Sequence, residues 1–155
     1  MACLPILIAF SNNVSLDSLN HRQFSTGAHC VYNLKAHLIF VVAYRRKAIC
    51  SRILQRLFEI FSEVCQSEQA QLLECSGERD HVHLLISYSP KLCLSELIRK
   101  LKAISSLKIR REFNGEIRHL LWGKRFWTKS YCVISVGDGA TTEIIEQYIR
   151  NQRSN

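Results

Sequence analysis

The sequence predicts a single α+β domain in which an antiparallel sheet is covered by helices on one face. Two observations favour this class. The 155 residues are 47% hydrophobic and 22% charged, which suits the apolar core of one domain. Segments with a strand-like pattern also alternate with segments in which apolar residues recur at helical spacing. We find no internal repeat and no low-complexity tract.

The amino-terminal part of the chain separates into an extension and a first strand and helix. Residues 1–28 show no sustained period, so we interpret them as an extension to a domain that spans residues 29–155. From His29 to Val42, β-branched and aromatic residues predict one long strand. An apolar stripe at helical spacing then predicts a helix from Ser51 to Glu68.

A hairpin and a second helix follow. Strands are predicted at Gln71–Ser76 and His81–Tyr88, and residues 77–80 between them contain the glycine and aspartate of a tight turn. Pro90 closes the hairpin, and apolar spacing predicts a helix over Ser95–Phe113.

The carboxy-terminal part predicts a last strand and a last helix. Residues 120–122 and 131–136 have strand character and are separated by a basic excursion, residues 124–129. After the glycines of residues 137–139, a helix is expected from about Thr141. The order strand, helix, strand, strand, helix, strand is that of the ferredoxin-like split βαβ fold, here with a carboxy-terminal helix added. That fold hosts RNA-binding modules, metal chaperones and nucleases, so it does not decide function.

Composition points to an anionic partner. The formal net charge of +8 and the pI of about 9.3 would draw the chain to a polyanion, and nucleic acid is the first candidate. The alternative is that the excess of basic over acidic residues only keeps the protein soluble. No apolar run approaches the roughly 20 residues that cross a bilayer, so no membrane partner is expected. The seven cysteines lack metal-type spacing, and we interpret them as reduced, buried residues of a cytoplasmic protein.

Four residues together suggest a metal-assisted reaction. His81 and His83 lie two apart in a predicted strand, so both side chains point to one face. Tyr148 and Gln152 lie four apart on the last predicted helix and share a face there. Two imidazoles and an amide oxygen form a plausible half-shell for a divalent cation, and a tyrosine hydroxyl is a suitable nucleophile that needs no nucleotide cofactor. For the histidines alone, the alternative is a chance pair in a strand. For Tyr148 and Gln152 alone, the alternative is an amphipathic helix packed in the core.

Basic side chains are candidates for contacting DNA. They end the first strand, crowd the second helix and recur in the excursion, where Trp122, Phe126, Trp127 and Tyr131 interleave with them and could stack on bases. The alternative is a core tryptophan beside a solvated charged loop. The predicted DNA-binding residues are Arg45, Arg46, Lys47, Lys102, Lys108, Arg110, Arg111 and Lys124.

These features resemble the single-tyrosine HUH transposases of the 200/605 class of insertion sequences. The resemblance implies that His81, His83 and Gln152 bind a magnesium or manganese ion, and that Tyr148 attacks DNA to leave a covalent 5′-phosphotyrosine and a free 3′-hydroxyl. It also implies a homodimer that cuts and rejoins single-stranded DNA beside hairpins at the ends of a mobile element. The matching segments are residues 32–40, 44–47, 80–86, 101–106, 121–122, 135–137 and 148–152.

The chain departs from the family pattern at three places, and two other functions stay open. Residues 1–28 have no recognised counterpart, Ala43 stands where lysine is usual, and Ala103 stands where glycine is common. A domesticated, repeat-associated relative would keep the same active-site residues. A non-catalytic nucleic-acid-binding module on the same fold would need no metal.

Overall fold

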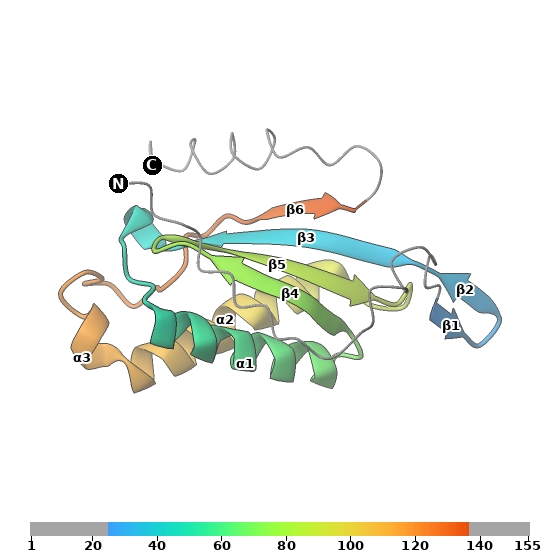
Figure 1. Ribbon diagram of the computed structural model, residues 1–155, viewed down its shortest axis with the longest axis horizontal. Helices are drawn as coiled ribbons and strands as arrows, with labels where there is room; N and C mark the ends of the chain where they lie inside the picture. Colours follow the sequence, from blue (N-terminus) through green and yellow to red (C-terminus); the bar gives the residue numbers. More distant parts are fainter. Residues whose placement is uncertain (1–24, 137–155) are drawn as a thin grey trace, which may run out of the picture.

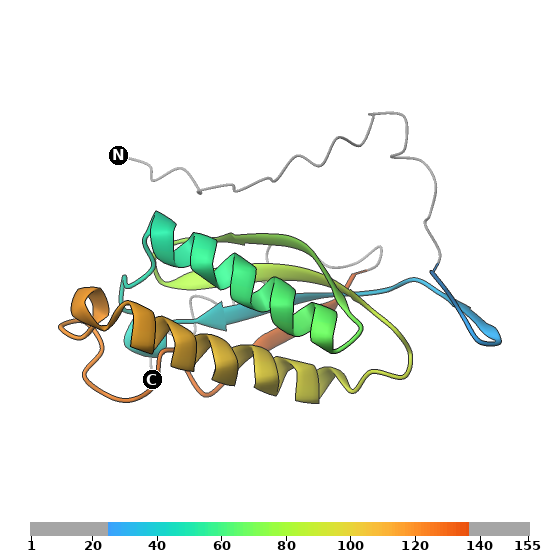
Figure 2. The same cartoon turned by 90° about the horizontal axis from the view of Figure 1, so that it is seen from below.

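A four-stranded antiparallel sheet forms the centre of the protein. The computed structural model describes residues 25–136, and the predicted final helix with Tyr148 and Gln152 lies outside them. Figures 1 and 2 show that both long helices, α1 and α2, lie on the same face of the sheet. This arrangement confirms the predicted α+β, ferredoxin-like class. The strands run in the order β4 (Gln71–Gly77), β5 (His81–Tyr88), β3 (Leu34–Val41) and β6 (Cys132–Ser135).

Alternation along the central strands decides which side chains meet the helices. Successive side chains of a strand point to opposite faces. In β3 the even-numbered Ala36, Leu38 and Phe40 belong to the core that α1 and α2 cover. In β5 the core side chains are again the even-numbered Val82, Leu84 and Ile86. The odd-numbered residues of both strands therefore point to the face without helices.

The two long helices have nearly the bounds that their apolar spacing predicts. Helix α1 spans Ser51–Ser67 and α2 spans Leu94–Glu112. Each buries one stripe of apolar side chains against the sheet, which is the main source of helix stability in a globular domain. Ion pairs tie the polar sides of the two helices together, with distances of 2.7 Å for Lys100–Glu68, Lys108–Glu63 and Arg56–Glu112.

The predicted single strand from His29 to Val42 is wrong, because the chain forms two strands there. A break at Asn33 separates β2 (Cys30–Tyr32) from β3. Leu34 pairs with Tyr88, the last residue of β5, so the chain before it has no neighbour in the main sheet. It pairs instead with β1 (Ser25–Gly27), and Figure 1 shows this ribbon projecting beyond the sheet. Strand β1 lies within the predicted extension.

The predicted strand over residues 120–122 is also wrong. A short helix, α3 (Asn114–Ile117), comes first, and its last turn continues through hydrogen bonds from the backbone N–H groups of Leu120 and Leu121 to the carbonyl of Ile117. Leu121 is buried in the core while Trp122 is exposed. The apolar run therefore reflects burial of one helical turn rather than strand pairing.

The cysteines divide by location, and the prediction that they are buried holds only in part. All six described cysteines are free thiols. Cys65 and Cys75 are buried, and burial raises the pKa of each thiol to about 12. Cys30, Cys50 and Cys93 are exposed, which composition could not indicate. Within residues 25–136, no helix combines the length and the apolar character needed to span a membrane.

Aromatic packing between α1 and the sheet should dominate stability. The ring of Phe61 is fully buried and lies 6.0 Å from Phe40 and 6.4 Å from Trp127, centroid to centroid. We predict that Phe61→Ala lowers the free energy of unfolding by about 3–5 kcal/mol, because it leaves a cavity among these rings. Urea unfolding followed by circular dichroism measures the change. Leu107→Ala, at an exposed position of α2, is the control and should stay within about 0.5 kcal/mol of the parent.

Candidate functional site

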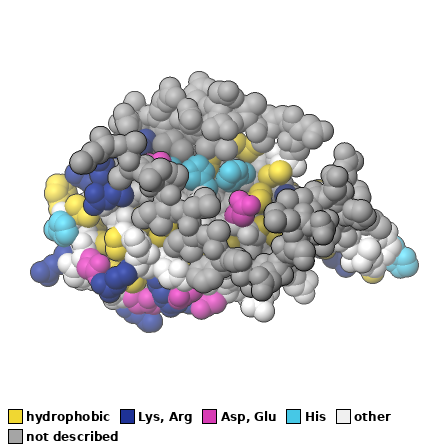
Figure 3. Space-filling view, viewed as in Figure 1, with side chains coloured by type: hydrophobic (Ala, Val, Ile, Leu, Met, Phe, Trp, Pro, Cys, Tyr) yellow, Lys and Arg dark blue, Asp and Glu magenta, His cyan; other side chains and the backbone are white. Residues whose placement is uncertain are grey.

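Two histidines lie together on the helix-free face of the sheet. His81 begins β5 and pairs with Val41, and His83 pairs with Ile39. The centroids of the two imidazole rings are 4.9 Å apart, and Figure 3 shows histidine side chains gathered over the middle of the sheet. The spacing of two residues therefore brings the rings together as expected. Their role as metal ligands stays a prediction.

A third histidine, His37 of β3, extends this group. Its ring centroid lies 5.5 Å from that of His83. His37 is not among the site residues predicted from the sequence, because only the register between β3 and β5 brings its ring close to His83. Burial lowers the pKa of His37, with partial compensation from the charge of Glu74. Burial and the charges of His81 and His37 lower the pKa of His83 to about 4, so His83 is neutral at physiological pH and its lone pair can bind a metal.

Asp80 joins His81 to Arg45. Its Oδ1 atom lies 2.7 Å from Nδ1 of His81, and its Oδ2 atom accepts hydrogen bonds from Nε and Nη2 of Arg45 at 3.0 and 2.7 Å. Burial would raise the pKa of Asp80, but the hydrogen bonds and the positive charge of Arg45 outweigh it and lower the pKa to about 2. From the sequence, Asp80 is placed in the turn and in the matching segment 80–86 but is not predicted as a site residue, although its position next to His81 was the available signal.

The side chains around His81 fit a divalent cation. Nδ1 of His81 is engaged by Asp80, which leaves Nε2 as the ring nitrogen available to a metal. His81 and His83 supply imidazole ligands, and Gln152, the third predicted ligand, lies outside residues 25–136. Ligand atoms of Glu78, Asp80 and His81 also lie within 4.8 Å of one another. Both oxygens of Asp80 already have partners, so the histidine pair is the better candidate.

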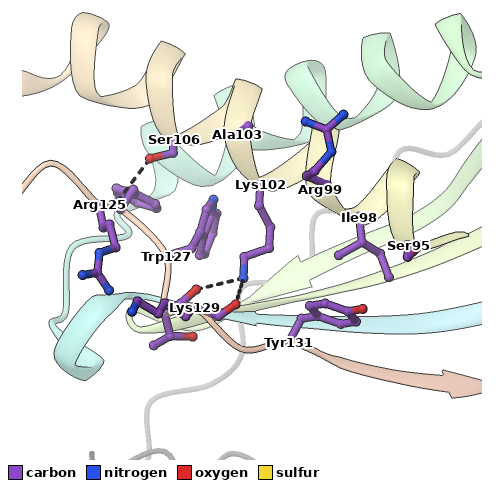
Figure 4. A pocket seen from close by; sticks show the side chains of 12 residues that line it. Ser95, Ile98, Arg99, Lys102, Ala103, Ser106, Arg125, Trp127, Lys129 and Tyr131 are labelled. Carbon is purple, nitrogen blue, oxygen red and sulfur yellow. Dashed lines mark hydrogen bonds between the residues drawn. The ribbon is translucent and has the colours of Figure 1, made fainter.

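The loop after α3, residues 121–130, is fastened to α2 by two of the predicted DNA-binding cations. Nζ of Lys102 donates to the backbone carbonyls of Thr128, Lys129 and Ser130 at 2.8, 2.9 and 2.8 Å, and Figure 4 shows the side chain reaching across to this segment. Burial lowers the pKa of Lys102 to about 8, which still leaves the amine mostly charged at neutral pH. Arg110 donates to the carbonyls of Leu121 and Arg125.

Two serines of α2 hold the same loop. Trp127 donates from Nε1 to the Ser105 hydroxyl at 2.8 Å, and that hydroxyl donates to the carbonyl of Leu101 at 2.6 Å. The backbone N–H of Phe126 donates to the hydroxyl of Ser106. The segment Leu101–Ser106, which carries part of the family resemblance, thus fixes the loop against the helix.

A second set of cations is exposed at the end of the molecule where η2 (Ala43–Arg45) lies, and Figure 3 shows Lys and Arg gathered there. The guanidinium of Arg46 lies 5.4 Å from the ring centroid of Trp122, whose side chain is 83% exposed. Lys47 and Lys124 are exposed as well. Among residues 25–136, these three cations make no ion pair with an acidic side chain. We call Tyr44, Arg46, Lys47, Trp122 and Lys124 the basic aromatic surface.

A groove borders this surface. It has a volume of about 640 Å³ and includes Tyr44, Lys124 and Arg125 in its lining. Tyr44 is 73% exposed and has a φ of 57°, a left-handed conformation that is uncommon for a bulky residue. The side chain of Tyr44 is therefore presented to solvent rather than packed in the core.

The interleaved aromatic residues and the remaining cations have different environments. Phe126 and Trp127 are buried in the core, whereas Trp122 and Tyr131 are exposed. Lys108 is paired with Glu63, and Arg111 is exposed at the end of α2. Of the predicted DNA-binding residues, Arg46, Lys47 and Lys124 are therefore exposed without an acidic partner among residues 25–136. Lys102, Lys108 and Arg110 are instead engaged by other groups of the protein.

Comparison with known proteins identifies the class. A family described as IS200-like transposases matches residues 30–152, a range that includes positions 81, 83, 148 and 152. The chain is similar to the ISDra2 transposase TnpA of Deinococcus radiodurans, with 29% identity over 132 residues that cover 84% of this chain and 91% of the relative. It is 31% identical over 125 residues to the transposase for insertion sequence element IS200 of Salmonella typhimurium, covering 81% and 80% of the two chains.

A solved structure agrees with these sequence matches. A crystal structure from Deinococcus radiodurans, described as a transposase, superposes with a TM-score of 0.77 at 28% identity and covers 84% of this chain and 99% of that one. The fold and the matches define a DNA transposase. The chain belongs to the family of IS200-like transposases, which confirms the resemblance to the single-tyrosine HUH class.

The contacts of Lys102 predict a structural role. We expect Lys102→Met to lower the free energy of unfolding by about 2 kcal/mol, because three backbone carbonyls lose a charged donor that a half-buried side chain supplies. Amide hydrogen exchange should accelerate at residues 128–130 and stay unchanged in α1. Arg99→Met, at an exposed position of the same helix, is the control. Unchanged exchange in the Lys102 variant would contradict this role.

Proposed function

We propose that the protein cleaves and rejoins single-stranded DNA beside hairpins at the ends of a mobile element, through a covalent 5′-phosphotyrosine at Tyr148. His81, His83 and Gln152 hold a magnesium or manganese ion in this proposal. The observation that carries it is the histidine pair on the open face of the sheet, with ring centroids 4.9 Å apart. The family match over residues 30–152 supports it, because the match includes the tyrosine and the glutamine.

The chemistry assigns a separate task to each residue. The cation would act as a Lewis acid that offsets negative charge on the phosphate. The oxygen of Tyr148 bonds to phosphorus while the bond from phosphorus to the 3′ oxygen breaks. The tyrosine proton passes to a base, and the 3′ oxygen leaves as a hydroxyl after it gains a proton. One phosphodiester replaces another, so the strand can be rejoined without a nucleotide cofactor.

The basic aromatic surface supplies a route for the DNA strand. Exposed aromatic rings stack on bases without sequence preference, and nearby cations hold the phosphates. Trp122 and Arg46 combine both features at one point, and Tyr44 borders the adjoining groove. On α2, by contrast, Lys100 pairs with Glu68, which follows α1, and Lys108 pairs with Glu63 of α1, so that face attracts DNA more weakly.

We also propose that the protein acts as a homodimer, as the resemblance implies. The mass of one chain is 17.9 kDa, so light scattering after size-exclusion chromatography distinguishes a dimer from a monomer. A monomer both free and bound to DNA would contradict this part of the proposal.

The covalent step is tested with a single strand taken from the region that flanks the coding sequence. With the label at the 3′ end, the parent protein and Mn²⁺ should give a protein-linked fragment on a denaturing gel. Tyr148→Phe should give none, because no hydroxyl remains. His81→Ala should lower the yield by about 100-fold or more, since a ligand is removed.

The affinity of each variant for the same strand separates catalysis from binding. His81→Ala should bind within about threefold of the parent, because phosphate contacts by Lys and Arg dominate affinity. An adduct in Tyr148→Phe would contradict the nucleophile assignment. Binding without any adduct from the parent protein would favour a non-catalytic hairpin-binding module instead.

The DNA route is tested by the salt dependence of binding. Arg46→Ala should weaken binding of a single strand and reduce the slope of log affinity against log salt by about one, since one phosphate contact is lost. Trp122→Ala should cost about 1–3 kcal/mol through lost stacking, with little change of slope. Lys108→Ala is the control, because its amine pairs with Glu63. Fluorescence anisotropy measures all three, and equal losses in the three variants would contradict the route.

A further inference from the structure

We propose that Asp80 is a positioning residue that fixes the tautomer and the orientation of His81, and that Arg45 locks Asp80 in place. This inference rests on the proposed metal site and adds residues that act on a ligand without being ligands themselves. The three side chains form a chain from a strained turn to the metal-binding imidazole.

The division of the carboxylate oxygens gives the first argument. Among the described residues, Oδ1 of Asp80 contacts His81, at 2.7 Å, and Oδ2 accepts from the guanidinium of Arg45, at 2.7 Å to Nη2. The side chains are only 6%, 12% and 15% exposed for His81, Asp80 and Arg45. Water therefore has little access to replace either contact. A carboxylate acceptor at Nδ1 places the imidazole proton on Nδ1 and leaves a lone pair on Nε2.

The backbone holds Asp80 from both sides. Its carbonyl accepts a hydrogen bond from the N–H of Val42 at 2.8 Å, where β3 leads into η2. The carbonyl of Arg79 accepts from the N–H of Ile49 at 2.9 Å, on the far side of the same turn. Asp80 is thus fixed between the end of β3 and the segment that enters α1.

Arg45 has an unusual backbone conformation while it makes this contact. Its φ is 52°, and that of Tyr44 is 57°, so two consecutive bulky residues are left-handed. Such conformations are strained and persist where surrounding contacts enforce them. The two hydrogen bonds from Arg45 to Asp80 are such contacts. The strained turn therefore has a function, which is to hold Arg45 where it can position Asp80.

The main alternative is that Asp80 binds the metal directly, together with Glu78 and His81, whose ligand atoms lie within 4.8 Å of one another. Two observations oppose it. Both oxygens of Asp80 are already engaged by cationic or N–H donors. A second cation at that position would also lie beside the guanidinium of Arg45, which repels it. Glu78 is exposed, and no side chain within residues 25–136 restrains it in a comparable way.

The variant Asp80→Asn tests whether Asp80 positions His81 or binds the metal directly, because it keeps the shape of the side chain. Arg45 can only donate, so it retains the amide oxygen of the asparagine, and the amide NH₂ then points at His81. That NH₂ donates to Nδ1, which moves the imidazole proton to Nε2. The nitrogen that would face the metal is then blocked.

The experiment uses the full chain labelled with ¹⁵N-histidine. Nuclear magnetic resonance at about pH 8, without metal, reports which nitrogen of His81 carries the proton. Electron paramagnetic resonance of free Mn²⁺ reports metal affinity. The parent protein should carry the proton on Nδ1. Asp80→Asn should carry it on Nε2 and bind Mn²⁺ about 10–100-fold more weakly. Glu78→Gln is the matched control and should retain the parent tautomer and affinity.

Each contrary outcome is distinct. If the parent protein carries the His81 proton on Nε2, the proposal is overturned, whatever the variants do. It is also overturned if Asp80→Asn has the same His81 tautomer as the parent protein. Equal loss of Mn²⁺ affinity in Glu78→Gln and Asp80→Asn would show that the carboxylates are the ligands. If the parent protein binds no Mn²⁺, the proposed metal site fails, while the tautomer measurement still decides the role of Asp80.

Discussion

The register between β3 and β5 is the constraint on which the rest of the structure depends. With Val41 opposite His81 and Ile39 opposite His83, the even-numbered side chains of both strands enter the core beneath α1 and α2. The histidines consequently point to the other face. Because side chains alternate with a period of two, a slip of one residue would bury His81 and His83 and expose the core. Core packing and the candidate metal site therefore require the same register between β3 and β5.

Helix α2 both completes the core and holds the loop 121–130 in place, and its basic residues serve the second of these functions. Its apolar stripe completes the core, while Lys102 and Arg110 donate to backbone carbonyls of the loop 121–130 and Ser105 accepts from Trp127. Some of the basic side chains behind the net charge of +8 therefore bind backbone carbonyls of the protein itself. A cation that holds backbone carbonyls keeps the loop in place and supports the exposed Trp122 beside Arg46. The position of the basic aromatic surface then depends on the core through this loop.

Local patterns predicted those elements in which one periodicity extends over many residues. Helices α1 and α2 and strand β5 have the predicted bounds to within one residue. The prediction of one long strand before Val42 was wrong because strand propensity carries no information about where a pairing partner ends. The apolar residues 120–122 were misassigned for a related reason, since a buried helical turn and a short buried strand have similar compositions.

The sequence by itself determined the secondary structure of the core, the shared face of His81 and His83, and the family. These follow from residues close together in the chain, because periods of 2 and 3.6 act over short distances. Only the tertiary structure decided that Asp80 joins His81 to Arg45, that His37 lies beside His83, and which cations remain exposed. Arg45 and Asp80 are 35 residues apart, and His37 meets His83 across two strands. Such contacts depend on strand pairing and on the packing of distant segments, which no local pattern encodes.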